Sequence, residues 1–164
     1  MKTKKFVTAI IMCFALLVSS VTVFALTPSE TTTTALRNAV AHDWTYNSRG
    51  YYEQNCLAHA IGDGHVWTWP WGSANPTKAQ ARSYLESRGY RYFLDANQAG
   101  ALPSDEVYAY ILNGGITHFA RRNSSLATNP NITAKWGRSE LFNHSTSNPY
   151  TNAVYGQLSF RFSK

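Results

Sequence analysis

One thiol and a distant imidazole are the groups of this 164-residue chain whose types could do chemistry together. The chain has two cysteines, Cys13 and Cys56, and Cys13 lies in an apolar N-terminal run that we expect to be removed. Cys56 is then left with no partner for an internal disulfide. A thiol acts as a nucleophile in its thiolate form, and a helix N-terminus or a neighbouring imidazole favours that form. Cys56 is therefore predicted to be a nucleophile.

His118 is the predicted base among the five histidines. It follows the Asn113-Gly114 pair, a hairpin signal, and so falls on the returning strand of the hairpin. A histidine held there can face a helix packed on the sheet and take a proton from a thiol on that helix. The alternative is that His118 only packs against the neighbouring strand.

A third residue should accept a hydrogen bond from the far ring nitrogen of His118. If the chain returns beside the strand of His118 near residues 132–137, then Glu140, Asn143 and His144 are the candidates. For the oxyanion that forms in acyl transfer, the default donor is the backbone N–H of Cys56. The side-chain amides that could assist it are those of Gln54 and Asn55.

Three tryptophans follow the predicted nucleophile closely. Such a loop, closed by Pro and Gly, either packs its rings over the core or forms a substrate-binding wall beside the thiol, and the two interpretations are compatible. The residues are Trp67, Trp69 and Trp71.

The elements that must position these residues can be predicted from pattern. A short apolar helix begins near Cys56 and stops at Gly62-Asp63-Gly64, and a second helix has Asn75 as its cap, Pro76 at its first position and Gly89 past its end. Residues 46–53 carry turn chemistry, and His144 falls in a polar loop. Further elements are a short helix at 35–42 and strands at 90–94, 106–112, 116–122, 132–136 and 155–162. This order, helices first and then an antiparallel sheet, predicts an α+β domain.

The N-terminus predicts export. Three lysines precede an apolar run over residues 6–24, and residues 23–25 (Val-Phe-Ala) offer small residues at the positions that a signal peptidase reads. Residues 1–25 are therefore predicted to be a cleaved signal peptide, and the protein is predicted to be secreted or at the cell surface. The alternative is a membrane anchor. We expect residues 26–45 to form a tail and short helix, and residues 46–164 to form one domain.

The number and distribution of charged residues argue against nucleic acid and membranes as binding partners. The full chain carries +6, but three lysines belong to the signal, so 12 basic and 9 acidic side chains remain. Because the basic residues are scattered apart from Arg121-Arg122, neither nucleic-acid binding nor, after signal cleavage, membrane binding is predicted. No cofactor or metal is predicted, and we expect a monomer.

Three blocks carry a resemblance to a known family. They are residues 55–63 (Asn-Cys-Leu-Ala-His-Ala-Ile-Gly-Asp) with the tryptophan-proline loop, residues 116–121 (Ile-Thr-His-Phe-Ala-Arg), and residues 134–137 with 142–144. Together they resemble the papain-like cysteine hydrolases, most closely an uncharacterised bacterial family of papain-like proteins, over roughly residues 52–162. The chain departs from that family at His59, where an aromatic residue is usual, and at Ala134, where a small hydroxyl is usual.

The resemblance implies a papain-like fold, in which an N-terminal helix bearing the cysteine packs on a small antiparallel sheet. It also implies a Cys56–His118 pair and favours His144 over Glu140 and Asn143 as the third residue.

The predicted function is a secreted cysteine peptidase or amidase that acts on an amide or ester bond, with a peptide or cell-wall-like substrate. One alternative is a non-catalytic extracellular binding domain with an inert thiol. A second is a zinc protein using Cys56, His59, His118 or His144, because Cys56 and His59 share a helix face.

Overall fold

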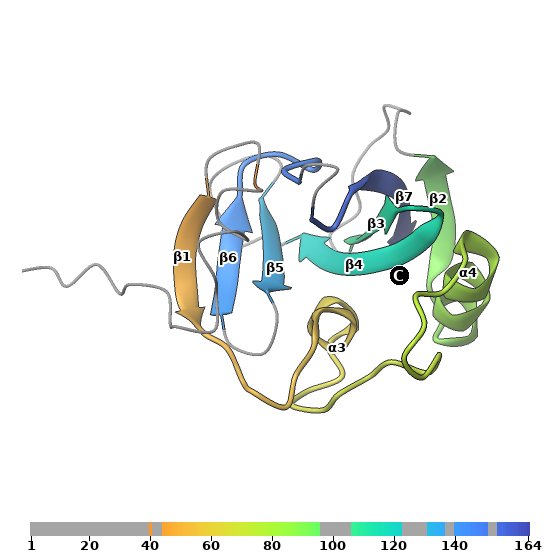
Figure 1. Ribbon diagram of the computed structural model, residues 1–164, viewed down its shortest axis with the longest axis horizontal. Coiled ribbons are helices and arrows are strands. Elements are labelled where there is room, and N and C mark those ends of the chain that lie inside the picture. Colours follow the sequence, from red (N-terminus) through yellow and green to blue (C-terminus); the bar gives the residue numbers. More distant parts are fainter. Residues whose placement is uncertain (1–39, 41–43, 96–105, 123–130, 137–139, 151–153) are drawn as a thin grey trace, which may run out of the picture.

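The computed structural model describes residues 40, 44–95, 106–122, 131–136, 140–150 and 154–164. These residues form one seven-stranded sheet in the order β1-β6-β5-β4-β3-β7-β2, in which every neighbouring pair is antiparallel (Figure 1). The strands are β1 (Trp44–Arg49), β2 (Arg91–Asp95), β3 (Glu106–Leu112), β4 (Gly115–Arg122), β5 (Ile132–Trp136), β6 (Glu140–His144) and β7 (Gln157–Ser163). The described helices are α3 (Cys56–Ile61) and α4 (Lys78–Ser87).

Both helices pack on the sheet, at different places. Helix α3 contacts β4 and β5 near the middle of the strand order, whereas α4 contacts β2 and β4. Figure 1 shows α3 beside the point where β4 and β5 meet, and α4 beyond β2. The start of α3 therefore lies against the central strands.

The central strands are buried on both faces. Because side chains alternate along a strand, Val107 and Ala109 of β3 join the core beneath the helices, while Tyr108 and Tyr110 join a second core on the other face. This second core is rich in aromatic side chains, among them Trp136, Phe142 and Tyr150. A side chain of this size contributes about 1.5–3 kcal/mol when it is fully buried, so both faces stabilise the fold.

A bulge sets the orientation of His118 in β4. Ile111 pairs with Ile116 and Tyr110 with His118, so Thr117 is an extra residue without a partner in this register. Ile116 belongs to the core beneath the helices, whereas His118 contacts Tyr110 from the other core. The bulge therefore turns His118 toward the aromatic core, although Ile116, two residues earlier, faces the core beneath the helices.

The predicted ends of α3 are confirmed. Asn55 is its N-cap, since its Oδ1 accepts a hydrogen bond from the backbone N–H of Ala58 at 2.9 Å. Gly62 ends the helix with a φ of 73°, a left-handed conformation that glycine adopts without steric cost.

For α4 the predicted start is wrong by two residues. Thr77, and not Asn75, is the N-cap, and it forms a capping box with Gln80. Pro76 consequently precedes the cap rather than occupying the first helical position. Gly89, predicted to lie past the end, does so with a φ of 85°.

The predicted α+β papain-like fold is wrong. The described chain is dominated by one seven-stranded antiparallel sheet with two short helices, and β1 comes before the helix that bears Cys56. The sheet is thus neither small nor preceded by an N-terminal helix among the described residues.

Two strands were missed, each for a physical reason. In β1, whose residues 46–49 were predicted to belong to a turn, Thr45, Asn47 and Arg49 are exposed, whereas Trp44 and Tyr46 pack against the aromatic core. In β6, whose His144 was predicted to lie in a polar loop, the buried positions are Glu140, Phe142 and His144. Since two of these three are polar, hydropathy does not show their alternation.

The hairpin prediction is confirmed, because Asn113 and Gly114 both have positive φ and connect β3 to β4. The predicted strands at 90–94, 132–136 and 155–162 correspond to β2, β5 and β7. The predicted signal peptide at 1–25 lies outside the described residues, as does the helix at 35–42 apart from Val40. Within the described ranges, no helix has the length and apolar character needed to cross a membrane.

Candidate active site

Cys56 and His118 line one cleft of about 320 Å³. The start of α3 and the tryptophan loop form one side of the cleft, and strands β4 and β5 with Tyr155 form the other. Two segments far apart in the sequence therefore bring the predicted nucleophile and the predicted base to the same cavity.

Cys56 is the first residue of α3 and is partly buried. Burial raises the pKa of its thiol to about 11, although the backbone N–H groups of Phe119, Leu57 and Cys56 itself and the nearby charge of Lys135 act in the opposite direction. The free thiol is therefore protonated at neutral pH.

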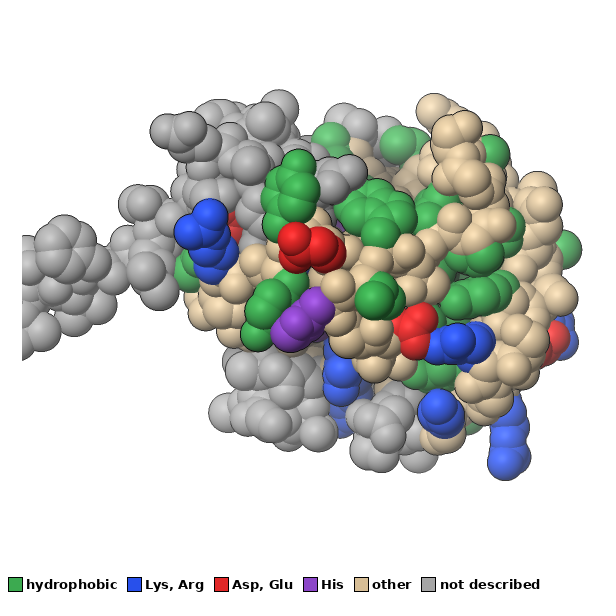
Figure 2. All heavy atoms as spheres, turned by 90° about the horizontal axis from the view of Figure 1, so that it is seen from below, with side chains coloured by type: hydrophobic (Ala, Val, Ile, Leu, Met, Phe, Trp, Pro, Cys, Tyr) green, Lys and Arg blue, Asp and Glu red, His purple; other side chains and the backbone are tan. Residues whose placement is uncertain are grey.

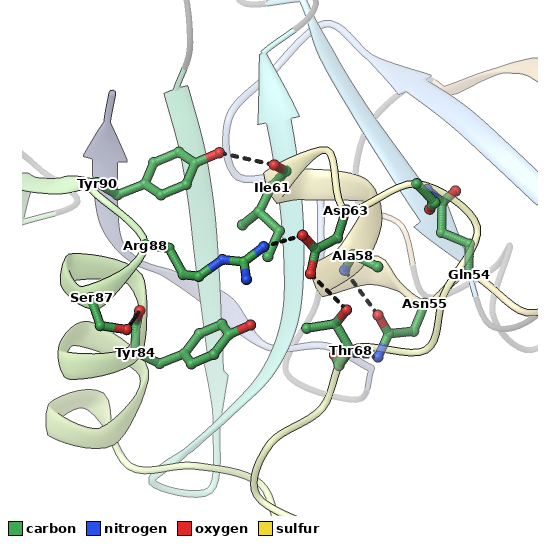
Figure 3. A network of polar contacts seen from close by, with 11 residues as sticks. Gln54, Asn55, Ala58, Ile61, Asp63, Thr68, Tyr84, Ser87, Arg88 and Tyr90 are labelled. Atoms are coloured by element: carbon green, nitrogen blue, oxygen red, sulfur yellow. Dashed lines mark hydrogen bonds and ion pairs between the residues drawn. The ribbon is translucent and has the colours of Figure 1, made fainter.

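A polar network fixes the start of α3 and the loop that follows it (Figure 3). Asn55 Nδ2 donates to the carbonyl of Thr68 at 2.7 Å, and Thr68 Oγ1 donates to Asp63 Oδ2 at 3.0 Å. Asp63 also forms an ion pair with Arg88, the residue that ends α4. These contacts connect the start of α3, the loop that follows α3 and the end of α4. They therefore stabilise the backbone conformation around Cys56.

His118 is almost fully buried, at 1% exposure. Its Nε2 lies 3.1 Å from the hydroxyl of Tyr150, and its ring stacks on that of Tyr155 with centroids 3.9 Å apart. Thr117 Oγ1 donates to the backbone carbonyl of Tyr155 at 2.7 Å and so helps to hold the stacking ring. Burial, and then the neighbouring His144 and His59, lower the pKa of His118 well below its ordinary value. The Tyr150 hydroxyl therefore engages Nε2 of His118.

Tyr150 joins His118 to His144. Its hydroxyl lies 3.3 Å from His144 Nε2 and accepts a hydrogen bond from Trp136 Nε1 at 3.2 Å. A hydroxyl has one proton to donate, so it donates to one histidine and accepts from the other. One of the two Nε2 atoms is then protonated and the other is not, and the hydroxyl connects the two rings. Burial lowers the pKa of His144 to about 3.

The three candidates for the third position differ in placement. His144 reaches His118 only through Tyr150. Glu140 pairs with Trp136 at the opposite end of β6. Asn143 Oδ1 accepts from Asn47 Nδ2 at 2.9 Å and from Thr133 Oγ1 at 3.3 Å. His144 is therefore the candidate that the structure connects to His118.

The two oxyanion candidates have other hydrogen bonds. Gln54 Nε2 donates to the carbonyl of Gly64, and Gln54 does not line the cleft. Asn55 lines it, but its Oδ1 caps α3 and its Nδ2 donates to Thr68. Both side chains hold the loop in place.

The tryptophans divide between the two predicted roles. Trp67 and Trp69 line the cleft. Trp71 instead packs on Phe119 and Tyr84, with ring centroids 6.4 Å and 5.4 Å away. The first two form a wall, and the third supports the core beneath α4.

Pattern reasoning missed three residues around His118: Lys135 and Tyr155, which line the cleft, and Tyr150, which bonds His118. Lys135 falls in a strand whose other buried residues are mostly apolar, and that contrast is a usable signal. Tyr150 and Tyr155 lie near a polar segment, where nothing in the local pattern distinguishes them from other loop aromatics.

The alternative that Cys56, His59, His118 or His144 binds zinc can be compared with the positions of these residues in the structure. His59 Nε2 is buried and has no hydrogen-bond partner among the described residues, and burial lowers the pKa of His59 to about 4, with Arg121 as the next cause. No group of three or more His, Cys, Asp or Glu residues that could hold a metal ion occurs in the described part of the chain.

Beside the cleft, apolar side chains reach solvent. Tyr51, Tyr52, Val66 and Trp67 are each about half exposed. Figure 2, which views the molecule from the side of α3, shows hydrophobic side chains gathered over the middle of this face and Lys and Arg side chains singly around them. Of these four residues, Trp67 also lines the cleft, so one partly exposed aromatic ring belongs to both the cleft and the surface.

Residues 43–163 match a family model described as "Domain of unknown function (DUF7689)". Neither the comparison with curated proteins nor the comparison with solved structures found a match.

Proposed function

Because the chain belongs to the DUF7689 family, whose description assigns no activity, we propose a function from the cleft itself: a cysteine peptidase or amidase that hydrolyses an amide or ester bond. The observation that carries this proposal is that Cys56 and His118 line the same cleft. A positioned thiol and imidazole in one cavity are the parts that acyl transfer through a thioester requires.

The proposed reaction has two halves. In the first, the Cys56 sulfur attacks the substrate carbonyl while His118 accepts the thiol proton, and His118 then gives that proton to the leaving group as the carbonyl–heteroatom bond breaks. In the second, His118 takes a proton from water as the water oxygen attacks the thioester carbonyl. His118 then gives that proton to the sulfur as the carbon–sulfur bond breaks, which releases the carboxylic acid and the free thiol.

In this mechanism the thiol and the imidazole begin as a neutral pair. The raised thiol pKa and the lowered imidazole pKa disfavour a resting thiolate–imidazolium pair. Proton transfer is therefore proposed to accompany attack on the carbonyl rather than to precede it.

The oxyanion is proposed to receive its hydrogen bond from the backbone N–H of Cys56. The side-chain amides of Gln54 and Asn55 already donate to the carbonyls of Gly64 and Thr68. We assign these two residues to positioning and the backbone to oxyanion stabilisation.

The proposed setting is extracellular, with a peptide or cell-wall-like substrate. The predicted signal at residues 1–25 supports export, and the +3 charge of the remaining chain is compatible with polymers that carry modest negative charge. Detection of the mature chain, beginning after Ala25, in the culture medium of a producing cell is the expected result.

The test uses p-nitrophenyl acetate with the purified protein. A burst of p-nitrophenol is expected, together with one acetyl group on Cys56 detected by mass spectrometry. Cys56→Ala should abolish the burst, and His118→Asn should slow it by about 10²–10⁴-fold, the range for loss of a general base. His65→Asn is the matched control, because His65 is exposed and stacks on Tyr51. Unchanged acetylation in His118→Asn would contradict the proposal.

A non-catalytic binding domain is the second candidate. Two observations favour it: the pKa of the Cys56 thiol is raised, and the face beside the cleft exposes aromatic residues. On this account Cys56 is acetylated no faster than the same thiol in the urea-unfolded chain, and His118→Asn leaves the rate unchanged.

A further inference from the structure

We propose that Tyr155 is a positioning residue of the cleft, whose ring covers one face of the His118 imidazole. In this position the ring fixes the plane of the imidazole and stabilises the charge that His118 gains when it accepts the Cys56 proton. This inference rests on the proposed function and deepens it. The contact between the two rings can also be measured without turnover.

Two contacts at right angles fix the His118 ring. The Tyr150 hydroxyl lies 3.1 Å from Nε2, and the Tyr150 ring is nearly perpendicular to the imidazole, at 88°. The Tyr155 ring is nearly parallel to the imidazole, at 20°, and the two ring centroids are 3.9 Å apart. A single hydrogen bond determines the direction of Nε2 but leaves the ring able to tilt about that bond. The stacked ring of Tyr155 restricts this tilt.

The turn that carries Tyr155 has an unfavourable backbone conformation. Tyr155 has a φ of 60°, in the left-handed region that is strained for a residue with a bulky side chain. Gly156 follows with a φ of 77°, and a Cβ at that position would overlap the backbone carbonyl of Ile111 in β3. Strain of this kind persists where surrounding contacts impose it, and it is concentrated at functional sites. The observed strain is therefore a reason to assign the Tyr155 ring a role in the cleft.

Two strands impose this conformation. Thr117, the extra residue of the β4 bulge, donates from Oγ1 to the backbone carbonyl of Tyr155 at 2.7 Å. Directly after the turn, Gln157 of β7 pairs with Ile111 of β3. The bulge that turns His118 toward the aromatic core thus also supplies the hydroxyl that holds the stacking residue. The same irregularity of β4 places the imidazole and the ring that covers it.

The stacked ring also acts on the charge of His118. In the proposed reaction the imidazole accepts the Cys56 proton, although burial lowers the pKa of His118 and so disfavours the cation. The face of an aromatic ring carries partial negative charge and attracts a cation placed over it. Tyr155 presents its face to the imidazole and lines the same cleft as Cys56. Its ring therefore stabilises the charged state that forms as the sulfur attacks.

The first experiment compares Tyr155→Phe with Tyr155→Leu in the p-nitrophenyl acetate assay. Phenylalanine keeps the ring, so the acetylation rate of Cys56 should stay within about twofold of the wild-type rate. Leucine removes the ring, so the rate at saturating substrate should fall about tenfold, as expected for loss of a cation–π contact in a buried site. The substrate concentration that gives half of this rate should change little, because the ring acts on His118 rather than on substrate binding.

Tyr92→Leu is the matched control. Tyr92 is also partly buried, but its ring packs on Phe160 and Phe162 and does not line the cleft. Its rate should equal the wild-type rate, and a fall as large as that of Tyr155→Leu would overturn the proposal. An equal loss in Tyr155→Phe and Tyr155→Leu would also overturn it. So would a change confined to the half-saturating concentration, because Tyr155 would then act only as a wall of the cleft.

A second measurement uses nuclear magnetic resonance and needs no turnover. A proton held over the face of an aromatic ring resonates upfield, and the ring protons of His118 are assigned by their absence in His118→Asn. Their signals should move downfield in Tyr155→Leu and stay in place in Tyr155→Phe. Unmoved signals in Tyr155→Leu would overturn the proposal, because the rings would then not be stacked in solution.

Thr117→Val tests the same arrangement if Tyr155→Leu does not fold. Valine keeps the shape of Thr117 but removes the hydroxyl that holds the Tyr155 carbonyl. The His118 signals should move downfield and the acetylation rate should fall, whereas no change in either would overturn the proposal. If the acetylation burst is absent in wild type while the signals respond as expected, the hydrolase proposal fails and Tyr155 still positions His118. If the burst is present and Tyr155→Leu equals wild type, only this inference fails.

Discussion

At the scale of single residues, the hydroxyl of Tyr150 determines which of the Nε2 atoms of His118 and His144 carries a proton. It accepts from Trp136 and lies between the Nε2 atoms of His118 and His144. Because it has one proton to donate, the protonation of one histidine determines that of the other. The partner of His118 Nε2 is therefore a hydroxyl, and a second imidazole lies behind that hydroxyl.

Tyr150→Phe should remove the hydrogen-bond connection between His118 and His144. Without the hydroxyl, both Nε2 atoms lose their common partner in a buried site, so we expect a loss of stability of about 1–3 kcal/mol. The acetylation rate of Cys56 should fall about tenfold, because His118 is no longer oriented, and the pH at which that rate is half-maximal should shift. Urea unfolding and the p-nitrophenyl acetate burst over a range of pH measure these effects.

Tyr110→Phe is the control for Tyr150→Phe. Tyr110 is equally buried, but its hydroxyl donates to the carbonyl of Ser147. A similar loss of stability with an unchanged pH profile is expected. If the two variants have the same profile, Tyr150 has only a packing role.

At the scale of elements, the cleft depends on how α3 begins. The six-residue helix is too short to be stable alone, so its start is fixed by Asn55, which caps the helix and holds the Thr68 loop at the same time. The sequence predicted this helix, its stop at Gly62 and the strand of His118. Each has a local signal: a cap or stop residue, or an Asn-Gly turn.

Asn55→Ala should weaken both the helix start and the cleft. Loss of the cap costs about 1 kcal/mol, and release of the Thr68 loop should lower the acetylation rate of Cys56 by about tenfold through misplacement of the nucleophile. Thr77→Ala, which removes the corresponding cap of α4, should cost similar stability and leave the rate unchanged. Equal rates in the two variants would show that the Asn55 contacts do not position Cys56.

At the scale of the whole molecule, the fold buries two histidines, His118 and His144, against the aromatic core. His118 and His144 are at most 2% exposed, and burial is the largest cause of the lowered pKa of each. The folded chain therefore opposes protonation that the unfolded chain accepts near its ordinary pKa of 6.5. Folding stability should depend on pH for this reason.

Stability is expected to fall as the pH drops below about 6.5. Between that value and the folded pKa of His144, about 3, the unfolded chain binds more protons, so each such histidine lowers the free energy of unfolding by about 1 kcal/mol per pH unit. Urea unfolding at pH 7, 6 and 5 measures the slope. His144→Gln should reduce the slope, whereas His65→Gln, at an exposed position, should not. An equal slope in wild type and His144→Gln would contradict this account.

The sequence by itself predicted the two residues that we propose to react, and it determined the local elements that carry them. The features predicted correctly have signals in the neighbouring residues of the chain. They are the start of α3 at Cys56 and its end at Gly62, the turn at Asn113-Gly114 that precedes His118, and the strand at 132–136. The tertiary structure alone decided the fold class, the two missed strands and the partners of the pair. Strands β1 and β6 are held by pairing and burial, not by their own hydropathy. Tyr150, Tyr155 and Lys135 reach the site only because distant strands meet around it, and long-range packing leaves no local pattern.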